Sequence, residues 1–456
     1  MVKIIKAIEK QSDMATELLF AKELEIESAA WESEFYKKSP KKITATALMY
    51  SFWQIQRLGK NTLGDWATKL GEHLNITVTE QSVNERFTQR AVDMAKLTLH
   101  KALNLNINKA KLAQDKTSLE NIIKLFNRIL LRDSTNQKLP AHLHEDFPGS
   151  YSHGDPTALM RIQALFDFTN EQWLDFQIGS NKDNDQGAAD CIADFLQPND
   201  LILQDLGYFT LDWLEQVIEN QFIITKWKPN CHLLDLKENK IDLLALLKGK
   251  KQVDMQVLVG SKKRIPMRLV ARKLPRAKAD KRIKEAKKDR HSKANHSKEY
   301  FELLRYEIYL TNISEDMLCA KEIAKLYGLR WYIEILFKSW KSYANFKKMF
   351  DKKKMHFFRT LFTVYILLIE FVWFTTVIYK EVKNKIKKMT TFHLSILKFM
   401  STINNMLTGI LNITEIRQLE PYIKQFAQHA THKPHTKRDN MINKYLYVKE
   451  LCVSFF

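Results

Sequence analysis

The segment Leu326–Lys341 (LYGLRWYIEILFKSWK) constrains the chain most, because it reads as one amphipathic helix. At roughly 100° per residue, its ionisable side chains fall within a sector about 80° wide. The sector contains Tyr327, Arg330, Glu334, Lys338 and Lys341. The opposite side is apolar or aromatic. One acid framed by cations, on a helix with an apolar back, suits a functional face, although a solvated face of mixed charges is the alternative.

Two further carboxylates follow short apolar runs upstream. Arg128–Leu131 (RILL) predicts a buried strand that ends just before Asp133, and Leu201–Gln204 (LILQ) predicts another that ends at Asp205. Aspartate is common after strands because it forms turns. A carboxylate at the end of a buried strand is nevertheless costly unless it binds something. Both aspartates are therefore candidate functional residues.

The predicted strands and helix between these two aspartates follow a defined order along the chain. Two strands, Thr157–Phe168 and Gln172–Gly179, and a helix across Gly187–Leu196 are predicted between the strands that carry the aspartates. Strand, two strands, helix, strand is the order of an RNase H-like core. The first and fourth strands of such a core lie side by side, which would bring the two aspartates together.

A family resemblance rests on these three sites. The spacing Tyr327-x2-Arg330-x3-Glu334-x6-Lys341 resembles the signature motif of the IS4 family of bacterial insertion-sequence transposases, which are DDE enzymes. The two aspartate motifs, Asp-Ser-Thr and Asp-Leu-Gly-Tyr-Phe, resemble the first and second catalytic motifs of that family. The resemblance covers residues 125–345 well and the ends loosely.

The resemblance implies that Asp133, Asp205 and Glu334 are the catalytic residues and the metal ligands. Two Mg²⁺ ions about 3.5–4 Å apart activate the attacking oxygen and stabilise the leaving oxygen in such enzymes. Carboxylates suit Mg²⁺, which prefers hard oxygen ligands, and Mn²⁺ is a possible substitute. Asp133 is expected to bridge both ions.

The resemblance also implies a DNA substrate and a set of DNA contacts. Tyr327, Arg330, Lys338 and Lys341 are expected to hold phosphates of the strand end. The implied reaction is cut-and-paste transposition: binding of terminal inverted repeats, cleavage through a DNA hairpin, and transfer to target DNA. Trp227 is the candidate to hold a flipped base.

The charge balance agrees with a polyanionic partner. Lys plus Arg number 72 against 52 Asp plus Glu, a net charge of +20, which favours nucleic acid or an anionic membrane. Four scattered cysteines indicate neither a disulfide framework nor a zinc site. With charges where a signal core would lie, we expect a cytoplasmic, nucleoid-associated bacterial protein.

The predicted fold class is α/β. A mixed-sheet, RNase H-like core over residues 125–220 and 301–350 is interrupted by a β-rich insertion at 221–300. An all-α N-terminal DNA-binding domain (1–110) and an α-helical C-terminal region (351–456) flank this core. Extra strands are expected at Phe222–Lys228, Met255–Val259 and Met267–Arg272, and Tyr306–Asn312 is expected to return as the last strand before the helix Leu326–Lys341.

Basic side chains outside the core predict further DNA contacts. In residues 1–110, capping boxes that begin at Thr62 and Ser82 each predict a short helix. The second would carry Arg86 and Arg90 toward phosphates and base edges, as in a helix-turn-helix reader, unless the domain is a plain helical bundle. The basic run Lys273–Lys298 is expected to contact the DNA backbone, with a solvated helix as the alternative.

The apolar run Leu361–Tyr379 is the one membrane candidate in the sequence. Glu370 lies at its centre, where a charge is costly in a bilayer, so we predict a buried core or dimer helix and no membrane partner. This run and the helices after it are the expected contact surface of a homodimer in the synaptic complex. Asp115, which precedes a predicted connecting helix, is assigned to capping or turn formation.

Two other functions share most of these features. An RNase H-like DNA nuclease without strand transfer would have the same triad. A domesticated DNA-binding protein would keep the basic surface and lose a carboxylate.

Overall fold

The computed structural model describes residues 25–40, 42–112, 125–151, 154–288, 297–343, 345–350, 355–389, 393–411 and 419–432. The proposed capping residue Asp115 and the expected helix after it lie outside these ranges.

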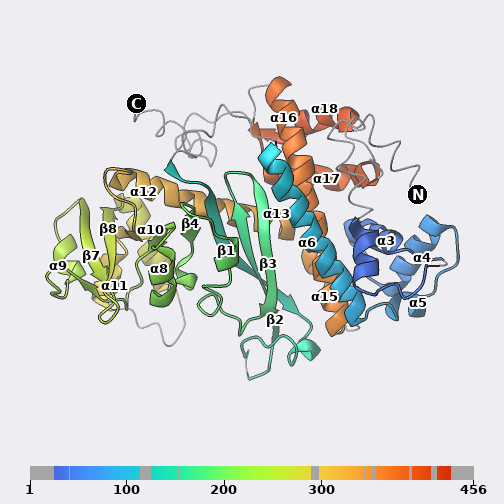
Figure 1. Cartoon of the computed structure of the whole chain (residues 1–456), viewed down its shortest axis with the longest axis horizontal. Coiled ribbons are helices and arrows are strands. Elements are labelled where there is room, and N and C mark those ends of the chain that lie inside the picture. Colours follow the sequence, from blue (N-terminus) through green and yellow to red (C-terminus); the bar gives the residue numbers. More distant parts are fainter. Residues whose placement is uncertain are drawn as a thin grey trace.

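One nine-stranded sheet forms the centre of the molecule, in the order β3-β2-β1-β4-β5-β9-β8-β7-β6 (Figure 1). Its strands are β1 (Ile129–Leu139), β2 (Ala158–Asp167), β3 (Gln172–Ser180), β4 (Leu201–Gln204), β5 (Phe222–Lys226), β6 (Leu233–Leu234), β7 (Gln252–Val259), β8 (Ile265–Lys273) and β9 (Tyr306–Thr311). β2 is antiparallel to β1, β4 is parallel to β1, and β5 is parallel to β4. The first five strands therefore have RNase H-like topology, which confirms the predicted fold class.

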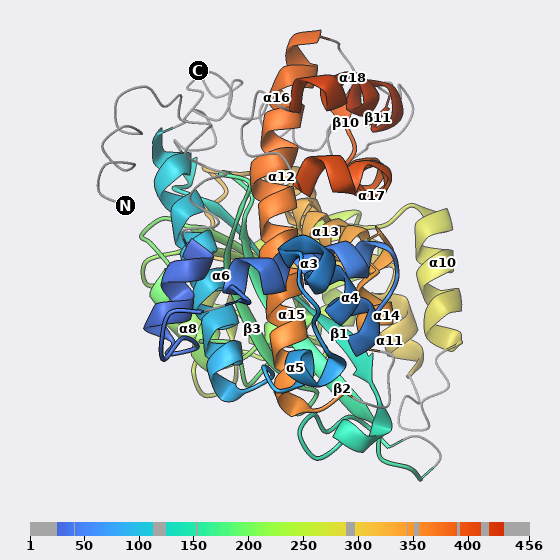
Figure 2. The ribbon, with the colours of Figure 1, turned by 90° about the vertical axis from the view of Figure 1, so that its right-hand side faces the viewer.

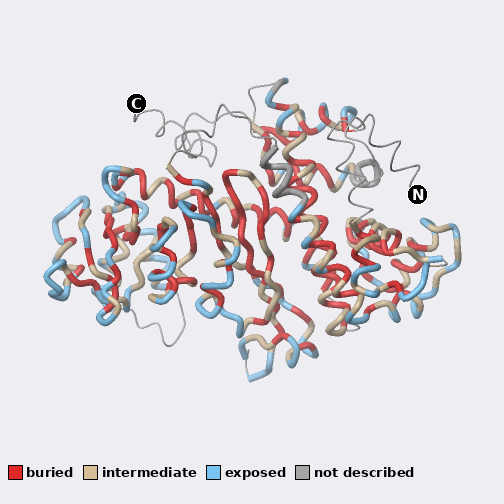
Figure 3. The backbone as a smooth tube through the Cα atoms, in the orientation of Figure 1, coloured by how far each residue is buried: buried red, intermediate tan, exposed pale blue. Residues whose placement is uncertain are grey.

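Both faces of this sheet are covered, because the strands carry apolar side chains on alternate sides. Ile129 and Leu131 of β1 face a core shared with the N- and C-terminal helices. Leu130, between them, faces a second core with α8 (Leu211–Val217) and the extended part of the sheet. Buried backbone accordingly runs through the middle of the molecule in Figure 3.

The predicted β-rich insertion does not begin at residue 221. β5 pairs with β4, and its Ile223 and Ile224 are fully buried, so this strand belongs to the RNase H-like part. The inserted strands β6–β8 then join the same sheet, because β9 pairs with both β5 and β8. The insertion thus extends the same sheet and is not a separate β unit. Its helices are α9 (Leu243–Leu247), α10 (Arg276–Lys287) and α11 (Lys298–Leu303).

β1 is longer than predicted, and Asp133 lies inside it. The run of apolar residues ends at Leu131, but the ladder with β2 continues to the pair Leu139–Ala158. Backbone pairing with a neighbouring strand, rather than burial alone, extends β1 beyond Asp133.

The helix predicted across Gly187–Leu196 is absent. Turns and one short 3₁₀ helix, Ala193–Phe195, occupy the segment. The buried guanidinium of Arg132 donates to the carbonyls of Ala188 and Ala189 and lies 4.1 Å from the ring centre of Tyr208. Both carbonyls accept from the arginine, and that of Ala188 also accepts a turn hydrogen bond from the backbone N–H of Cys191.

The N-terminal domain is helical, as predicted. Its helices after residue 44 are α3 (Ala45–Arg57), α4 (Leu63–Leu74), α5 (Glu80–Asn84) and α6 (Gln89–Leu112). Thr62 caps α4, as its capping box predicts, through a 3.0 Å bond from the backbone N–H of Asp65. The prediction from the second capping box is wrong, because Thr79 caps α5 and Ser82 lies within that helix.

The C-terminal helices complete the core instead of leaving an apolar surface. They are α15 (Phe357–Val372), the π-helical segment η5 (Trp373–Ile378), α16 (Tyr379–Met389), α17 (Ile396–Leu411) and α18 (Glu420–His429). A two-stranded sheet joins β10 (His393–Leu394) to β11 (Thr431–His432). Figures 1 and 2 show α15 between α6 and the helices α3–α5.

The run Leu361–Tyr379 is therefore a buried core helix, which is one of the two predicted alternatives, and it does not provide the predicted dimer surface because it is buried within one chain. Trp53 donates a 3.0 Å hydrogen bond to the carbonyl of Ile366, and Trp173 donates one of 3.0 Å to Thr375. In the described part of the chain, the continuous helix Phe357–Lys387 is long and apolar enough to cross a membrane. However, 83% of its most apolar window is buried inside the protein.

Candidate active site

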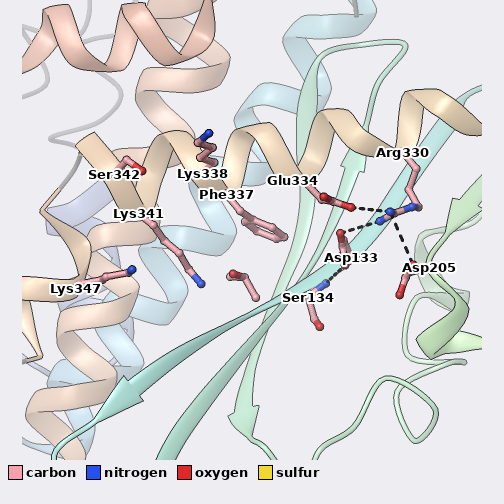
Figure 4. A pocket seen from close by; sticks show the side chains of 11 residues that line it. Asp133, Ser134, Asp205, Arg330, Glu334, Phe337, Lys338, Lys341, Ser342 and Lys347 are labelled. Atoms are coloured by element: carbon pink, nitrogen blue, oxygen red, sulfur yellow. Dashed lines mark hydrogen bonds and ion pairs between the residues drawn. The ribbon is translucent and has the colours of Figure 1, made fainter. Parts of the chain in front are cut away.

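The strand arrangement brings the two predicted aspartates to neighbouring positions. Arg132 and Gln204 are the last paired residues of the parallel strands β1 and β4. The next residue of each strand is Asp133 and Asp205. Glu334 projects toward them from the first turn of α13 (Trp331–Tyr343), as Figure 4 shows.

The segment Leu326–Lys341 is not one continuous α-helix. α12 (Ala320–Tyr327) ends at Tyr327, a 3₁₀ turn η4 (Gly328–Arg330) follows, and α13 begins at Trp331. The turn is tighter than an α-helix. Arg330 and Glu334 nevertheless remain on the face toward β1 and β4, as the helical arithmetic predicts.

The guanidinium of Arg330 connects all three carboxylates. Its Nη1 lies 3.0 Å from Oδ2 of Asp133, and its Nη2 lies 2.6 Å from Oε1 of Glu334 and 3.8 Å from Oδ1 of Asp205. The arginine side chain is only 5% exposed. Three acids that would otherwise repel one another are thus held together by one buried cation.

Asp133 is the most strongly perturbed of these acids. Burial raises its pKa to about 7, although the guanidinium of Arg330 and the backbone N–H of Ser134, 2.8 Å away, oppose the shift. The charges of Asp205 and Glu334 add to the increase. A carboxyl with this pKa exchanges its proton near neutral pH, which is typical of functional sites.

Tyr327 is placed behind Arg330 and not on the pocket surface. The phenol is buried and donates a 3.2 Å hydrogen bond to the carbonyl of Gln204, the residue before Asp205. The guanidinium carbon of Arg330 lies 5.8 Å from the centre of its ring, and Nζ of Lys226 lies 5.7 Å from it. In this arrangement the phenol supports the end of β4 and the arginine.

A pocket of about 510 Å³ opens beside the carboxylates. Its lining residues are Asp133, Ser134, Thr135, Asp205, Arg330, Glu334, Phe337, Lys338, Lys341, Ser342 and Lys347. One end of it is therefore acidic with a central arginine, and the other end is formed by lysines (Figure 4). The pocket includes the predicted Lys338 and Lys341.

Lys347 is a pocket residue that the sequence pattern did not single out. It comes from α14 (Phe346–Met349), after a break in the helical pattern at Asn345. The helical spacing that relates side chains to Glu334 does not extend past this break, so it does not predict where the side chain of Lys347 lies. The nearest signal in the sequence is the pair Lys347-Lys348, which does not distinguish the pocket residue from its neighbour.

The other predicted DNA contacts lie outside the pocket. Arg86 is half-buried and donates to the carbonyl and the hydroxyl of Ser82, whereas Arg90 is 3.1 Å from the carboxylate of Glu34. Trp227 follows β5 and donates a 3.1 Å hydrogen bond to the carbonyl of Cys231.

The donor set of the three acids fits divalent metal ions. Carboxylate oxygens are the ligands that Mg²⁺ prefers, and all three acids converge on a cation, the guanidinium of Arg330. Among the described residues, no group of three or more His, Cys, Asp or Glu side chains is spaced to coordinate a metal. Arg330 stands between the three acids, so metal binding there requires this side chain to move.

Comparisons with known proteins identify the family of the chain. The sequence profile of the family described as "Transposase DDE domain" matches residues 124–369. A transposase for insertion sequence element IS231F of Bacillus thuringiensis subsp. israelensis is 27% identical over 339 residues, 70% of each chain. A transposase for insertion sequence element IS1151 of Clostridium perfringens is 26% identical over 380 residues, 78% of each chain.

A solved structure of piggyBac transposase, in a synaptic complex with hairpin DNA, matches with a TM-score of 0.45 and 11% identity. The match covers 93% of this chain and 86% of that one. The transposase profile spans more than half of the 456 residues and includes Asp133, Asp205 and Glu334. The chain therefore belongs to the DDE transposase family and is an enzyme of phosphodiester hydrolysis and transesterification.

Proposed function

We propose that this transposase binds the terminal inverted repeats of an insertion sequence, cleaves the DNA there, and joins the freed 3′ ends to target DNA. The reaction is cut-and-paste, with a DNA hairpin as intermediate. One observation carries the proposal: acids from β1, the end of β4 and α13 converge on one guanidinium. Three carboxylates brought this close repel one another unless a cation lies among them, and Asp133, which is 15% exposed, also loses solvation.

Enzymes of this family normally use divalent metal ions, and we propose Mg²⁺ for this chain, with Mn²⁺ as a substitute. Asp133, Asp205 and Glu334 would hold two ions, with Asp133 shared between them. Bound there, the ions would supply activation of the attacking oxygen and stabilisation of the leaving oxygen. For the ions to bind, Arg330 must leave its carboxylate partners, and it would then pair with a phosphate.

The chain's own residues have separate tasks in this proposal. Arg330 suits bidentate contact with a phosphate that enters the pocket, and Tyr327 holds the arginine within reach. Lys338 and Lys341 neutralise the backbone on the side of the pocket away from the acids. Phe337 and the buried back of α13 keep these cations on one face.

Surfaces outside the pocket supply the remaining DNA contacts. α10 exposes most of its basic side chains, buries only Ala279, and stands at the edge of the molecule in Figure 2. We place the DNA backbone along it, with Arg90 as a further contact in the N-terminal domain. Trp227 remains the candidate for a flipped base. Two copies of the chain would hold the two ends of the element in the bacterial cytoplasm.

The test is a cleavage and strand-transfer assay on duplexes from the ends of the element that encodes the chain. Asp133→Asn, Asp205→Asn and Glu334→Gln should each abolish Mg²⁺-dependent cleavage and leave duplex binding largely intact. The matched control is Asp212→Asn, since Asp212 is an 87% exposed acid on the next helix after Asp205. This control should cleave normally.

Three outcomes would contradict the proposal. Cleavage that persists in a triad variant would show that the acids are not the reacting centre. Cleavage by the unaltered chain without any joined product would indicate a nuclease without strand transfer. Duplex binding without metal-dependent cleavage would indicate a DNA-binding protein only.

A further inference from the structure

Two lysines from different helices meet at the end of the pocket opposite the carboxylates. Lys341 comes from the last turn of α13 and Lys347 from α14, and their side chains extend toward the same space in Figure 4. Nζ of Lys341 donates a 2.6 Å hydrogen bond to the carbonyl of Asn136 in β1. Burial, and secondly the charge of Lys347, lower the pKa of Lys341 to about 8.

No acid of the described residues forms an ion pair with either lysine, although the acids of the triad line the same pocket. Those acids are already paired with Arg330. Two ammonium groups that converge without a carboxylate repel each other, and a shared anion removes this cost. The geometry therefore fits an anionic ligand at this end of the pocket.

The position of Lys347 is held by the N-terminal domain. Asn345 adopts a left-handed backbone conformation (φ 50°) and donates hydrogen bonds of 3.0 and 3.2 Å to the carbonyls of Gln56 and Arg57 at the end of α3. Asn61 donates to the carbonyl of Lys348, and Phe346 is fully buried. α14 is consequently anchored on both sides, so the pocket lysine is preorganised.

We propose that Lys341 and Lys347 together bind one backbone phosphate of the DNA strand, at a subsite separate from the phosphodiester that meets the three carboxylates. This subsite rests on the proposed function, since it assumes a DNA strand in the pocket. It assigns a positioning role to Lys347, because the ammonium lies at the far end of the pocket from the reacting acids. A strand held there is aligned before the acids act on it.

Lys348 provides a matched control. It is the next residue of α14 and is also exposed, but its Nζ lies against Gly59 in the link between α3 and α4 rather than in the pocket. Lys347→Gln and Lys348→Gln remove the same charge from the same short helix. Only the first should affect the subsite, and Lys347→Arg should restore it because the positive charge returns.

The experiment scans the DNA backbone one phosphate at a time. The full-length chain binds a fluorescein-labelled duplex from the end of its element, in EDTA, and single phosphates near the cleavage position are replaced by neutral methylphosphonates. For the unaltered chain and Lys348→Gln, one position should weaken binding beyond its neighbours. For Lys347→Gln that position should weaken binding clearly less, because only Lys341 still contacts the phosphate, while the other positions keep their effects.

Salt dependence gives a second readout. The logarithm of the affinity falls linearly with the logarithm of the salt concentration, and removing one phosphate contact should reduce the magnitude of this slope by about 0.9. Between 50 and 200 mM salt, the affinity ratio of unaltered chain to Lys347→Gln should therefore shrink roughly 3.5-fold. Melting temperatures of the variants would show that the fold is intact.

Several results would overturn the subsite. Equal effects of Lys347→Gln and Lys348→Gln in every assay would mark a general electrostatic effect. Lys347→Gln could also keep the unaltered methylphosphonate profile, which would place no phosphate at Lys347. A chain that binds the duplex with this subsite but never cleaves contradicts the proposed function alone, so the two failures are distinguishable.

Discussion

Arg57 and Glu370 form a buried ion pair across 313 positions of the sequence. Nη2 of the arginine is 3.0 Å from Oε1 of the glutamate, and the two side chains are 3% and 1% exposed. Arg57 also donates a 2.6 Å hydrogen bond to the side chain of Asn404 in α17. One arginine of the N-terminal domain thus joins two helices of the C-terminal region.

Glu370→Ala should lower the free energy of unfolding by about 3–5 kcal/mol, because it leaves the Arg57 charge buried without its partner. Chemical denaturation followed by circular dichroism measures this. The surface pair Lys69–Glu72, at 2.6 Å, is the control, and Glu72→Ala should cost less than about 1 kcal/mol. Equal losses in both variants would contradict a special role for the buried pair.

Truncation after residue 355 should destroy DNA binding and not merely prevent pairing of two ends. The deletion removes α15, against which α6 and α3 pack, and exposes Trp53 and Trp173. Size-exclusion chromatography and near-ultraviolet circular dichroism should show an aggregated or loosely packed fragment. A soluble fragment that still binds one DNA end would contradict the packing described here.

DNA binding should weaken between pH 7 and pH 9 more in the unaltered chain than in Lys341→Arg. The lowered pKa of Lys341, about 8, means that its charge is lost in this range, whereas arginine stays charged. Anisotropy titrations at fixed salt measure the difference. Lys347→Gln removes the like charge beside Lys341 and should shift the midpoint to higher pH.

The lowered pKa of Lys341 also predicts how the stability of the fold changes with pH. The folded-state pKa of Lys341 lies below its unfolded value of 10.5, so the unfolded chain binds more protons between about pH 8 and pH 10.5. This group therefore makes the DNA-free fold more stable as pH rises through about 8. Lys341→Gln should remove that part of the pH dependence.

Arg330→Gln should increase Mn²⁺ affinity in the absence of DNA by on the order of tenfold or more, since the guanidinium holds the acids at ion-pair distance. Electron paramagnetic resonance of free Mn²⁺ measures the binding. Arg264→Gln, which breaks a 3.0 Å surface pair with Glu238 in the inserted part of the chain, is the control and should leave Mn²⁺ affinity unchanged. Weaker Mn²⁺ binding by Arg330→Gln would show that the arginine supports the metal site instead of competing with it.

The two N-terminal arginines should respond differently. Arg86 is half-buried and bonded within its own turn, so Arg86→Gln should lower stability and leave the salt slope of DNA binding unchanged. Arg90 is partly exposed, so Arg90→Gln should lower that slope by about 0.9 if it contacts one phosphate. Equal slopes for Arg90→Gln and the unaltered chain would exclude such a contact.

The strand order and the contact between Arg330 and Glu334 were predictable from local patterns. Residues 129–131 and 201–203 are continuous apolar runs, and buried strands in parallel pairs have this composition. Arg330 and Glu334 are four residues apart, a spacing that survives the short 3₁₀ turn between α12 and α13.

Other features depended on partners distant in the sequence. The carbonyls of Ala188 and Ala189 accept from Arg132, more than fifty residues upstream, a contact that the local sequence pattern does not reveal. Thr79 rather than Ser82 caps α5, and both are plausible caps on their own. Lys347 enters the pocket only because Asn345 turns the chain and bonds to α3.

The hydrogen bond from Trp53 to the carbonyl of Ile366 has a consequence for synthesis of the protein. At about 5–20 residues per second, a ribosome needs roughly 15–60 s to travel between these two positions. During that interval the N-terminal helices lack the helix that buries their largest side chains, and they must be shielded from aggregation. We therefore expect a translation product that stops before α15 to leave these helices without their packing partner.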